Sequence, residues 1–240
     1  GLFSVGGLSG AAGMSALLAL GLPLMVAALV IAGLLALIII TQWRHLIGRI
    51  AAAAGHSAGF RWPRGLVLLL GLVCFVSFMA EGAMLDWSAV FLRDFRGVSA
   101  ASAGLGYAGF SVAMALGRLT GDRTIARFGP VASVRVGAAT AAAGLLVAAA
   151  VPWPAAAMLG FVLVGLGAAN IVPVMFGAAG RLPGVSPAVS IATVTTLGYA
   201  GLLSGPALIG FLAHASSLPI ALAAVGGLLI MVSISARVVR

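Results

Sequence analysis

Glu81 is the residue whose type and position most directly suggest chemistry. It is one of only four acidic side chains among 240 residues, and it lies inside an apolar run from Gly65 to about Leu92. At 1.5 Å per residue it lies roughly 24 Å into that run, in the outer third of a ~30 Å hydrocarbon layer. An ionised acid facing lipid there costs a few kcal/mol, so Glu81 should face a cavity or a partner. The position suits a proton carrier, or else an acid that reaches the outer water boundary.

Asp86 is the next acid along the same run. It lies about 140° around a regular helix from Glu81, so the two carboxylates do not share a face and do not form a catalytic pair. Because Trp87 follows it directly, Asp86 fits the water–lipid boundary, where Trp anchors helices.

A cluster of charges lies in residues 117–129, which read Gly-Arg-Leu-Thr-Gly-Asp-Arg-Thr-Ile-Ala-Arg-Phe-Gly between two apolar runs. One acid and three arginines in so apolar a chain are expected where water is. The sequence therefore predicts a tight loop between two membrane helices. An acid such as Asp122 near a helix N-terminus is also favourable on dipole grounds alone.

Two further positions combine polar groups with helix-breaking residues or with repeated hydroxyls. Pro173 removes a backbone hydrogen bond and bends its helix, and the nearby amide of Asn170 can satisfy the freed group or reach a polar solute. Thr195 and Tyr199 belong to a polar strip in a later run. That strip can line a pore, or its hydroxyls can bond back to their own helix.

Composition identifies the class of protein that must position these residues. The chain is 62% hydrophobic and 7% charged, whereas a soluble domain carries about 25% charged residues. Such a chain spans a membrane as helices or as a closed barrel. Its apolar runs of about 20 residues suit helices, because barrel strands would show alternating segments of about ten residues. We therefore expect an all-α membrane protein.

The lengths of the apolar runs and the turn residues between them predict about eight transmembrane helices. They cover Gly1–Leu20, Pro23–Thr41, Gly65–Leu92, Ala100–Leu119, Val131–Val151, Ala155–Ala179, Ser186–Leu212 and Leu218–Ala236. With the polar stretch Gln42–Arg64 on the cytoplasmic side, 11 arginines lie inside and 2 outside, which follows the positive-inside rule. The chain does not begin with Met, so we expect that its N-terminal part is missing or processed.

Several function classes are disfavoured by the residues. The arginines are scattered singly between runs and form no stripe, which argues against nucleic acid as a partner. There is no Lys and no phosphate-binding loop, so ATP is not expected to drive this chain. No metal-ligand spacing and no nucleophile–base arrangement stands out, so we expect no metal, no cofactor and no enzyme.

The chain resembles the major facilitator superfamily of secondary transporters. Residues 117–129 resemble its loop signature, and 198–210 resemble its eleventh helix. Residues 165–173 are similar to its tenth helix. Residues 81–88 resemble the end of its seventh helix in a bacterial branch near fucose-permease-like transporters, and 1–7 resemble the fifth helix of that branch.

The resemblance implies helices five to twelve of a twelve-helix fold, whose helices one to four are absent. Residues 1–42 would be the last two helices of the N-terminal bundle, 43–64 the central cytoplasmic loop, and 65–240 the C-terminal six-helix bundle. It further implies a multi-pass protein of the bacterial inner membrane that moves a small organic solute by alternating access, driven by a solute or proton gradient.

The resemblance also implies roles for individual residues. Asp122 and Arg123 would form a charge latch at the cytoplasmic end. The remaining members of this gating loop would be Gly117, Arg118, Gly121 and Arg127. From their own chemistry and position, as argued above, Glu81, Asn170, Thr195 and Tyr199 are expected on the solute and proton pathway. The alternative is a non-transporting membrane scaffold, or a truncated half-transporter that needs a partner chain.

Overall fold

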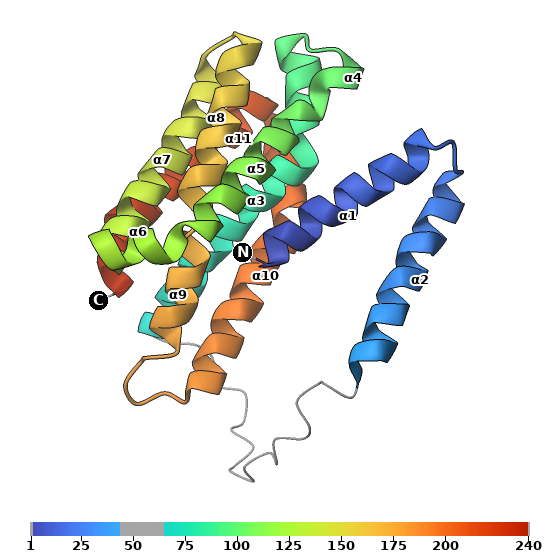
Figure 1. Cartoon of the computed structure of the whole chain (residues 1–240). Helices are drawn as coiled ribbons and strands as arrows, with labels where there is room; N and C mark the ends of the chain where they lie inside the picture. The colour runs from blue at the N-terminus through green and yellow to red at the C-terminus, as the bar shows by residue number, and fades with distance from the viewer. Residues whose placement is uncertain (1, 44–64, 240) are drawn as a thin grey trace. The chain divides into compact units, whose positions relative to one another are not determined.

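Helices form all the regular structure of the described residues. The computed structural model of the chain describes residues 2–43 and 65–239 (Figure 1). Its contacts divide the chain into two units, Gly1–Trp62 and Pro63–Arg240. The Gln42–Arg64 stretch lies almost wholly outside the described residues, so its expected role as a central loop stays a prediction.

The first unit contains two helices joined by a short turn. Helix α1 covers Leu2–Ala19, and α2 covers Leu24–Gln42. The turn between them includes Gly21, whose φ of +82° favours glycine, and Pro23, which directly precedes α2. Because α2 carries no charged residue and is largely exposed in this unit, it has the surface of a helix that contacts lipid or other helices.

The second unit contains the remaining helices. They are α3 (Leu66–Arg96), α4 (Ala100–Ala103), α5 (Leu105–Leu119), α6 (Gly121–Phe128), α7 (Pro130–Ala150), α8 (Pro154–Ala168), α9 (Ile171–Ala179), α10 (Pro187–Ala215), α11 (Leu218–Ile234) and the 3-10 turn η2 (Ser235–Val239). Proline begins α7, α8 and α10, where its missing N–H leaves no bond unmade.

Seven segments of the described residues are long and apolar enough to cross a membrane. They are α2, α3, α4 with α5, α7, α8 with α9, α10, and α11 with η2. The first expected span is also helical, as α1, but it is not among these seven. The fold is therefore all-helical and multi-span, as the apolar runs predict. The expected span Ala155–Ala179 is not one helix, because it breaks between Ala168 and Ile171.

The long helices of the second unit form two layers of three. Helix α8 packs between α5 and α7 in one layer, and α3 packs against α10 and α11 in the other. The layers join where α7 meets α11 and where α3 meets α5, α8 and α9. Helices α5 and α10 are not a closely packed pair in the described part of the chain, and we call the side of the second unit between them its open edge.

Close approach of α3 and α10 depends on glycine. A Cβ added at Gly201 of α10 would come within 2.8 Å of the backbone Cα of Phe75 on α3, and one at Gly205 would meet Met79. In a membrane, where apolar side chains gain little by leaving lipid, small residues at this spacing let helix backbones pack directly. These two glycines belong to one of the small-xxx-small pairs in the sequence.

Replacing Gly201 by Leu is therefore expected to lower the thermal unfolding midpoint by roughly 5–10 °C, because overpacking costs about 1–3 kcal/mol. The measurement is a melting curve of the detergent-solubilised gene product. Gly227→Leu in α11 is the matched control, since nothing lies within 4 Å of a Cβ added there. An equal shift in both variants would contradict the packing account.

Candidate functional site

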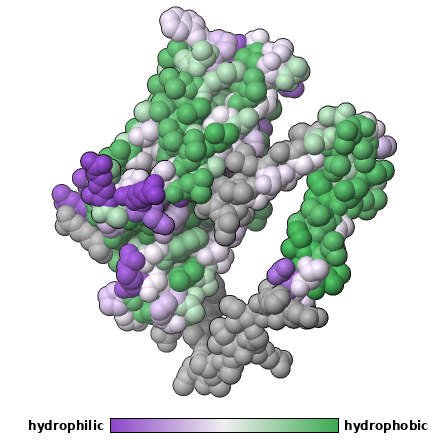
Figure 2. Space-filling view, viewed as in Figure 1, coloured by the Kyte–Doolittle hydropathy of each residue, from purple (hydrophilic) through white to green (hydrophobic). Residues whose placement is uncertain are grey.

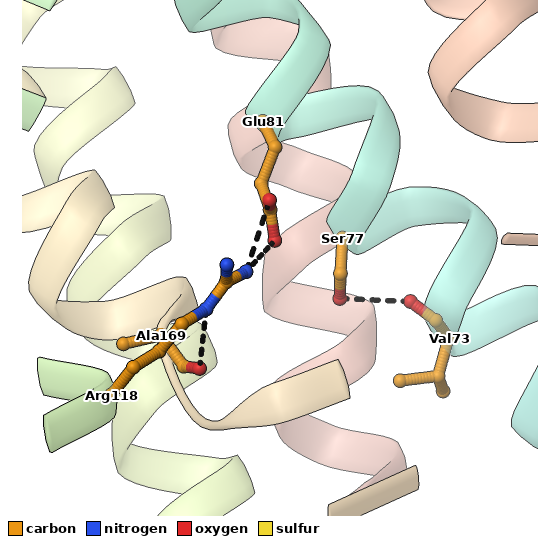
Figure 3. A network of polar contacts seen from close by, with 5 residues as sticks. All are labelled: Val73, Ser77, Glu81, Arg118 and Ala169. Carbon is orange, nitrogen blue, oxygen red and sulfur yellow. Dashed lines mark hydrogen bonds and ion pairs between the residues drawn. The ribbon is translucent and has the colours of Figure 1, made fainter. Parts of the chain in front are cut away.

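An ion pair joins Glu81 of α3 to Arg118 of α5 in the interior of the second unit (Figure 3). The Nη2 atom of Arg118 donates to both carboxylate oxygens of Glu81, at 3.0 Å to Oε1 and 3.1 Å to Oε2. The side chains are only 12% and 14% exposed, for Arg118 and Glu81 respectively. The oppositely charged partner that the depth of Glu81 requires is therefore Arg118.

Helix direction explains why these two side chains meet. A short connection joins α3 to α4 and α5, so α3 and α5 run in opposite directions. Side chains lean toward the N-terminus of their own helix. Glu81 thus leans toward the start of α3, and Arg118 leans from near the end of α5 back toward its start. Figure 3 shows the two side chains pointing toward one another from separate helices.

Helix α3 extends beyond the expected end at Leu92 to Arg96, so Glu81 lies at the midpoint of this helix. Its expected depth in the membrane stays a prediction. One expectation from the sequence is wrong here. Arg118 does not lie in a water-exposed loop, because it belongs to α5 and is largely buried. The charge of Arg118 does not require water, because Glu81 compensates it inside the protein.

Arg118 also contacts the break between α8 and α9. Its Nε donates to the carbonyl oxygen of Ala169 in a long hydrogen bond of 3.4 Å. In a continuous helix this carbonyl would accept from the N–H four residues later, but that residue is Pro173, which has no N–H. Arg118 therefore binds the backbone group that Pro173 leaves free.

Asn170 ties the same break to α5 by a different bond. Its Nδ2 donates to the carbonyl oxygen of Gly117 at 3.2 Å. A Cβ at Gly121 would overlap the Oδ1 of Asn170, and one at Gly117 would lie 2.6 Å from the Cβ of Ala169. The two glycines thus make room for the helix break against α5. The amide of Asn170 bonds to a neighbouring helix and not to the carbonyl that Pro173 frees.

Pro173→Ala is expected to close the break, because the alanine N–H at this position can bond to the Ala169 carbonyl and extend α8 into α9. Backbone amides around residues 169–174 should then exchange with deuterium at least tenfold more slowly, as measured by hydrogen–deuterium exchange with mass spectrometry. Pro206→Ala is the matched control, because Pro206 also lies inside a helix but in α10. If exchange at 169–174 did not change in Pro173→Ala, proline would not be the cause of the break.

The predicted tight loop at residues 117–129 is instead mostly helical. Gly117 and Arg118 lie in α5, and only Thr120 separates α5 from α6, which is followed by Gly129 with φ +79°. Thr120 has helical dihedrals, and its hydroxyl donates to the Leu116 carbonyl. The chain therefore turns with little loss of backbone hydrogen bonding.

The charges of α6 lie on the surface. Asp122, Arg123 and Arg127 are exposed, and the Arg127 guanidinium lies over the Phe128 ring at 5.4 Å from its centroid. Within residues 2–43 and 65–239, Asp122 forms no ion pair. The structure therefore separates Arg118 from the other charged members of the expected gating loop.

Tyr199 lies on the open edge of the site, whereas Thr195 bonds to its own helix. The Tyr199 ring stacks on Phe78 of α3, with centroids 5.5 Å apart. Phe78 lies one turn before Glu81 and on the same side of α3. The Thr195 hydroxyl donates to the Ile191 carbonyl at 2.7 Å, which is the second of the two alternatives that the sequence leaves open. Tyr199 is 47% exposed, so it offers a polar and aromatic surface beside the ion pair.

Sequence reasoning missed the carbonyl of Ala169 and the pairing of Arg118 with Glu81. The signal for the first was Pro173, four residues after Ala169. No signal in the sequence pairs Glu81 with Arg118, because the other arginines of that cluster are equally available by spacing. Among the residues that the structure describes, no three His, Cys, Asp or Glu side chains come together as metal ligands.

The fold and site define a multi-span helical membrane protein with a charged pair in its interior. Three curated proteins match the chain. An uncharacterised MFS-type transporter of Yersinia pestis is 46% identical over 239 residues, which is 100% of this chain and 62% of that protein. An uncharacterised transporter of Sinorhizobium fredii is 32% identical over 100% of this chain and 64% of its own length. The membrane protein MosC of Rhizobium meliloti is 32% identical over 76% of this chain and 45% of its own length.

No family model matches the chain, and no solved structure matches it at a significant level. By sequence, the chain is similar along its whole length to an MFS-type transporter. It spans a little under two thirds of the length of the first two of these relatives.

Proposed function

We propose that this chain forms the larger part of a secondary active transporter that moves a small organic solute across a bacterial inner membrane, coupled to protons. In this proposal Glu81 carries the proton. Arg118 neutralises the carboxylate when the proton leaves, and the pair opens when the proton returns. Two helical bundles would rock about a central site near the middle of the membrane.

The observation that carries this proposal is the Glu81–Arg118 pair itself. A charged pair in the middle of a membrane helix is costly, so such pairs are rare and mark solute or proton pathways. Both side chains keep some exposure, and the pair joins α3 to α5, which borders the open edge between α5 and α10. A proton carrier requires such access to water.

The solute would bind at the open edge, beside the ion pair. Tyr199 and Phe78 provide an aromatic surface there, which suits the apolar face of a sugar or a small metabolite. Asn170 and Thr195 were expected on this pathway, but their polar groups bond inside the protein, so we propose them as supporting residues. Assignment to a fucose-permease-like branch belongs to the same proposal, and it favours sugars as the first solutes to test.

The remaining assignments are also proposals. Residues 1–42 would belong to the N-terminal bundle, 43–64 to the cytoplasmic connection and 65–240 to the C-terminal bundle. The exposed charges of α6 would form a latch, in which Asp122 and Arg123 pair with the other bundle in one state of the cycle. Their exposure within the second unit leaves them available for such a contact.

A transport assay on the full product of the native gene tests the proposal. The protein is reconstituted in liposomes, a pH gradient is imposed, and uptake of radiolabelled monosaccharides and small metabolites that shift its melting temperature is measured. Accumulation of one of them, abolished by a protonophore, is the expected result. If the protein bound a solute but moved it no faster than protein-free liposomes, the alternative of a non-transporting scaffold would be the better account.

A further inference from the structure

A groove on the outer face of the α5–α8–α7 layer lies apart from the solute site proposed at the open edge, and the two share only Asn170, at the inner end of the groove. It has a volume of about 310 Å³ and lies between α6, α7 and α8, on the opposite side of this layer from α3 and α11. Volumes of this size, roughly 300–1,000 Å³, are typical of sites for small molecules. Its lining includes Phe128, Ala132, Val136 and Leu166, so most of its surface is apolar.

Four polar side chains line the groove, and all of them except Thr140 form hydrogen bonds within the protein. The Thr124 hydroxyl donates to the Thr120 carbonyl at 3.1 Å, and the Ser133 hydroxyl donates to the Gly129 carbonyl at 2.8 Å. Asn170, at the inner end, donates to Gly117. A polar solute would therefore find few free donors, whereas a hydrocarbon chain would lose nothing by entering.

The surface around the groove is apolar on one side and basic on the other. Val136, Leu166 and Phe128 are 63%, 45% and 62% exposed. Figure 2 shows hydrophilic atoms gathered over α6, next to a broad hydrophobic surface over α5, α7 and α8. This boundary between a charged helix and an apolar face matches the level at which lipid headgroups meet hydrocarbon.

Arg127 lies at the rim of the groove. Its guanidinium lies over the ring of Phe128, and that ring lines the groove. Arg123 and Asp122 are the other charged side chains of α6, and all three are exposed. The two arginines outnumber the single acid, so the rim attracts anions.

From this placement we propose that the groove binds one acyl chain of an anionic phospholipid, whose phosphate contacts Arg127. The groove supplies the apolar lining for the chain, and α6 supplies the positive charge for the headgroup. The bound lipid would hold α6 against α7 and α8. This inference does not depend on the solute or on the proton coupling.

The test uses the full-length protein in nanodiscs of phosphatidylcholine. A small fraction of phosphatidylglycerol carries a photoreactive diazirine in its acyl chain, and labelled peptides are mapped by mass spectrometry after irradiation. Labels should concentrate on residues 132–140 and on Leu166. Arg127→Gln should reduce this labelling about fivefold, the effect of removing one basic residue near an anionic membrane surface, and Arg127→Lys should largely retain it.

Arg135→Gln is the matched control. Arg135 lies on α7 and is exposed, but it points about 130° around that helix from the mean direction of the α7 residues that line the groove, so its loss should leave labelling unchanged. Ala132→Trp should fill the groove and abolish labelling there. Equal labelling by a phosphatidylcholine probe would assign the groove to bulk lipid, and no labelling at 132–140 would show that another part of the protein covers it. Either result would overturn the proposal.

Discussion

Replacement of Glu81 by Gln is expected to abolish accumulation of solute against a gradient. Gln keeps the size and polarity of the side chain but cannot release a proton. For one proton per solute, a gradient of about one pH unit supports about tenfold accumulation, and the variant should reach only equal concentrations inside and outside. Exchange of labelled for unlabelled solute should survive, because exchange needs no net movement of protons.

Uptake and exchange assays in the same proteoliposome preparation measure this difference. Asp86→Asn provides the control, since Asp86 is on the same helix and is exposed but does not contact Arg118. It should accumulate solute like the wild type. Accumulation by Glu81→Gln at the wild-type ratio would show that the proton travels by another route.

The second large effect is expected on stability. Arg118→Gln leaves the Glu81 carboxyl without its buried partner, and loss of one member of a buried pair costs about 3–5 kcal/mol. The double variant Glu81→Gln/Arg118→Gln has no unpaired charge, so it should recover most of that loss. Arg118 also donates to Ala169, and this contact should keep the recovery incomplete.

A double-mutant cycle from thermal or denaturant unfolding measures the coupling between the two residues. The pair Arg93–Asp94 is a useful comparison, because its Nε–Oδ1 distance is shorter, at 2.6 Å, but its side chains are 55% and 44% exposed. Solvent should reduce that coupling to about 0–1 kcal/mol. Equal coupling energies for the two pairs would mean that burial does not strengthen the Glu81–Arg118 interaction.

Sequence reasoning could locate the helices of this protein because hydropathy and length determine what can cross a membrane. It placed the starts of α3, α10 and α11 within a residue of where they lie. It also required a partner for Glu81, since an unpaired acid in lipid is costly. These inferences depend on the free energies of transferring single residues and segments from water to lipid, and these can be judged from the sequence alone.

The details of the site depend on quantities that the sequence does not state. The extension of α3 beyond Leu92, which places Glu81 at the midpoint of the helix, is not apparent from the apolar run. Arg118 and Glu81 meet because two antiparallel helices lean their side chains toward each other, and local spacing gives no sign of this. The groove beside Arg127 is formed by three helices, so it can be located only when their packing is known.

The break at Ala169 is an intermediate case. Pro173 predicts that some backbone carbonyl is left free, and the bond count identifies it as that of Ala169. Which group would bind it was open, and the neighbouring Asn170 was a reasonable expectation. The structure gives this bond to Arg118, so the residue that neutralises Glu81 also contacts the helix break. Movement of Arg118 away from Glu81 would therefore also disturb its hydrogen bond to the break between α8 and α9.

The most direct test of the account is to follow protons during solute uptake. Solute is added to a lightly buffered suspension of proteoliposomes that contain the full gene product, with no imposed gradient, and the external pH is recorded. If Glu81 carries the proton, the external pH rises with wild-type protein and stays constant with Glu81→Gln, although labelled solute still equilibrates. The same pH rise in both proteins would contradict the assignment of the proton to Glu81, and an unchanged pH with both proteins would contradict proton coupling altogether.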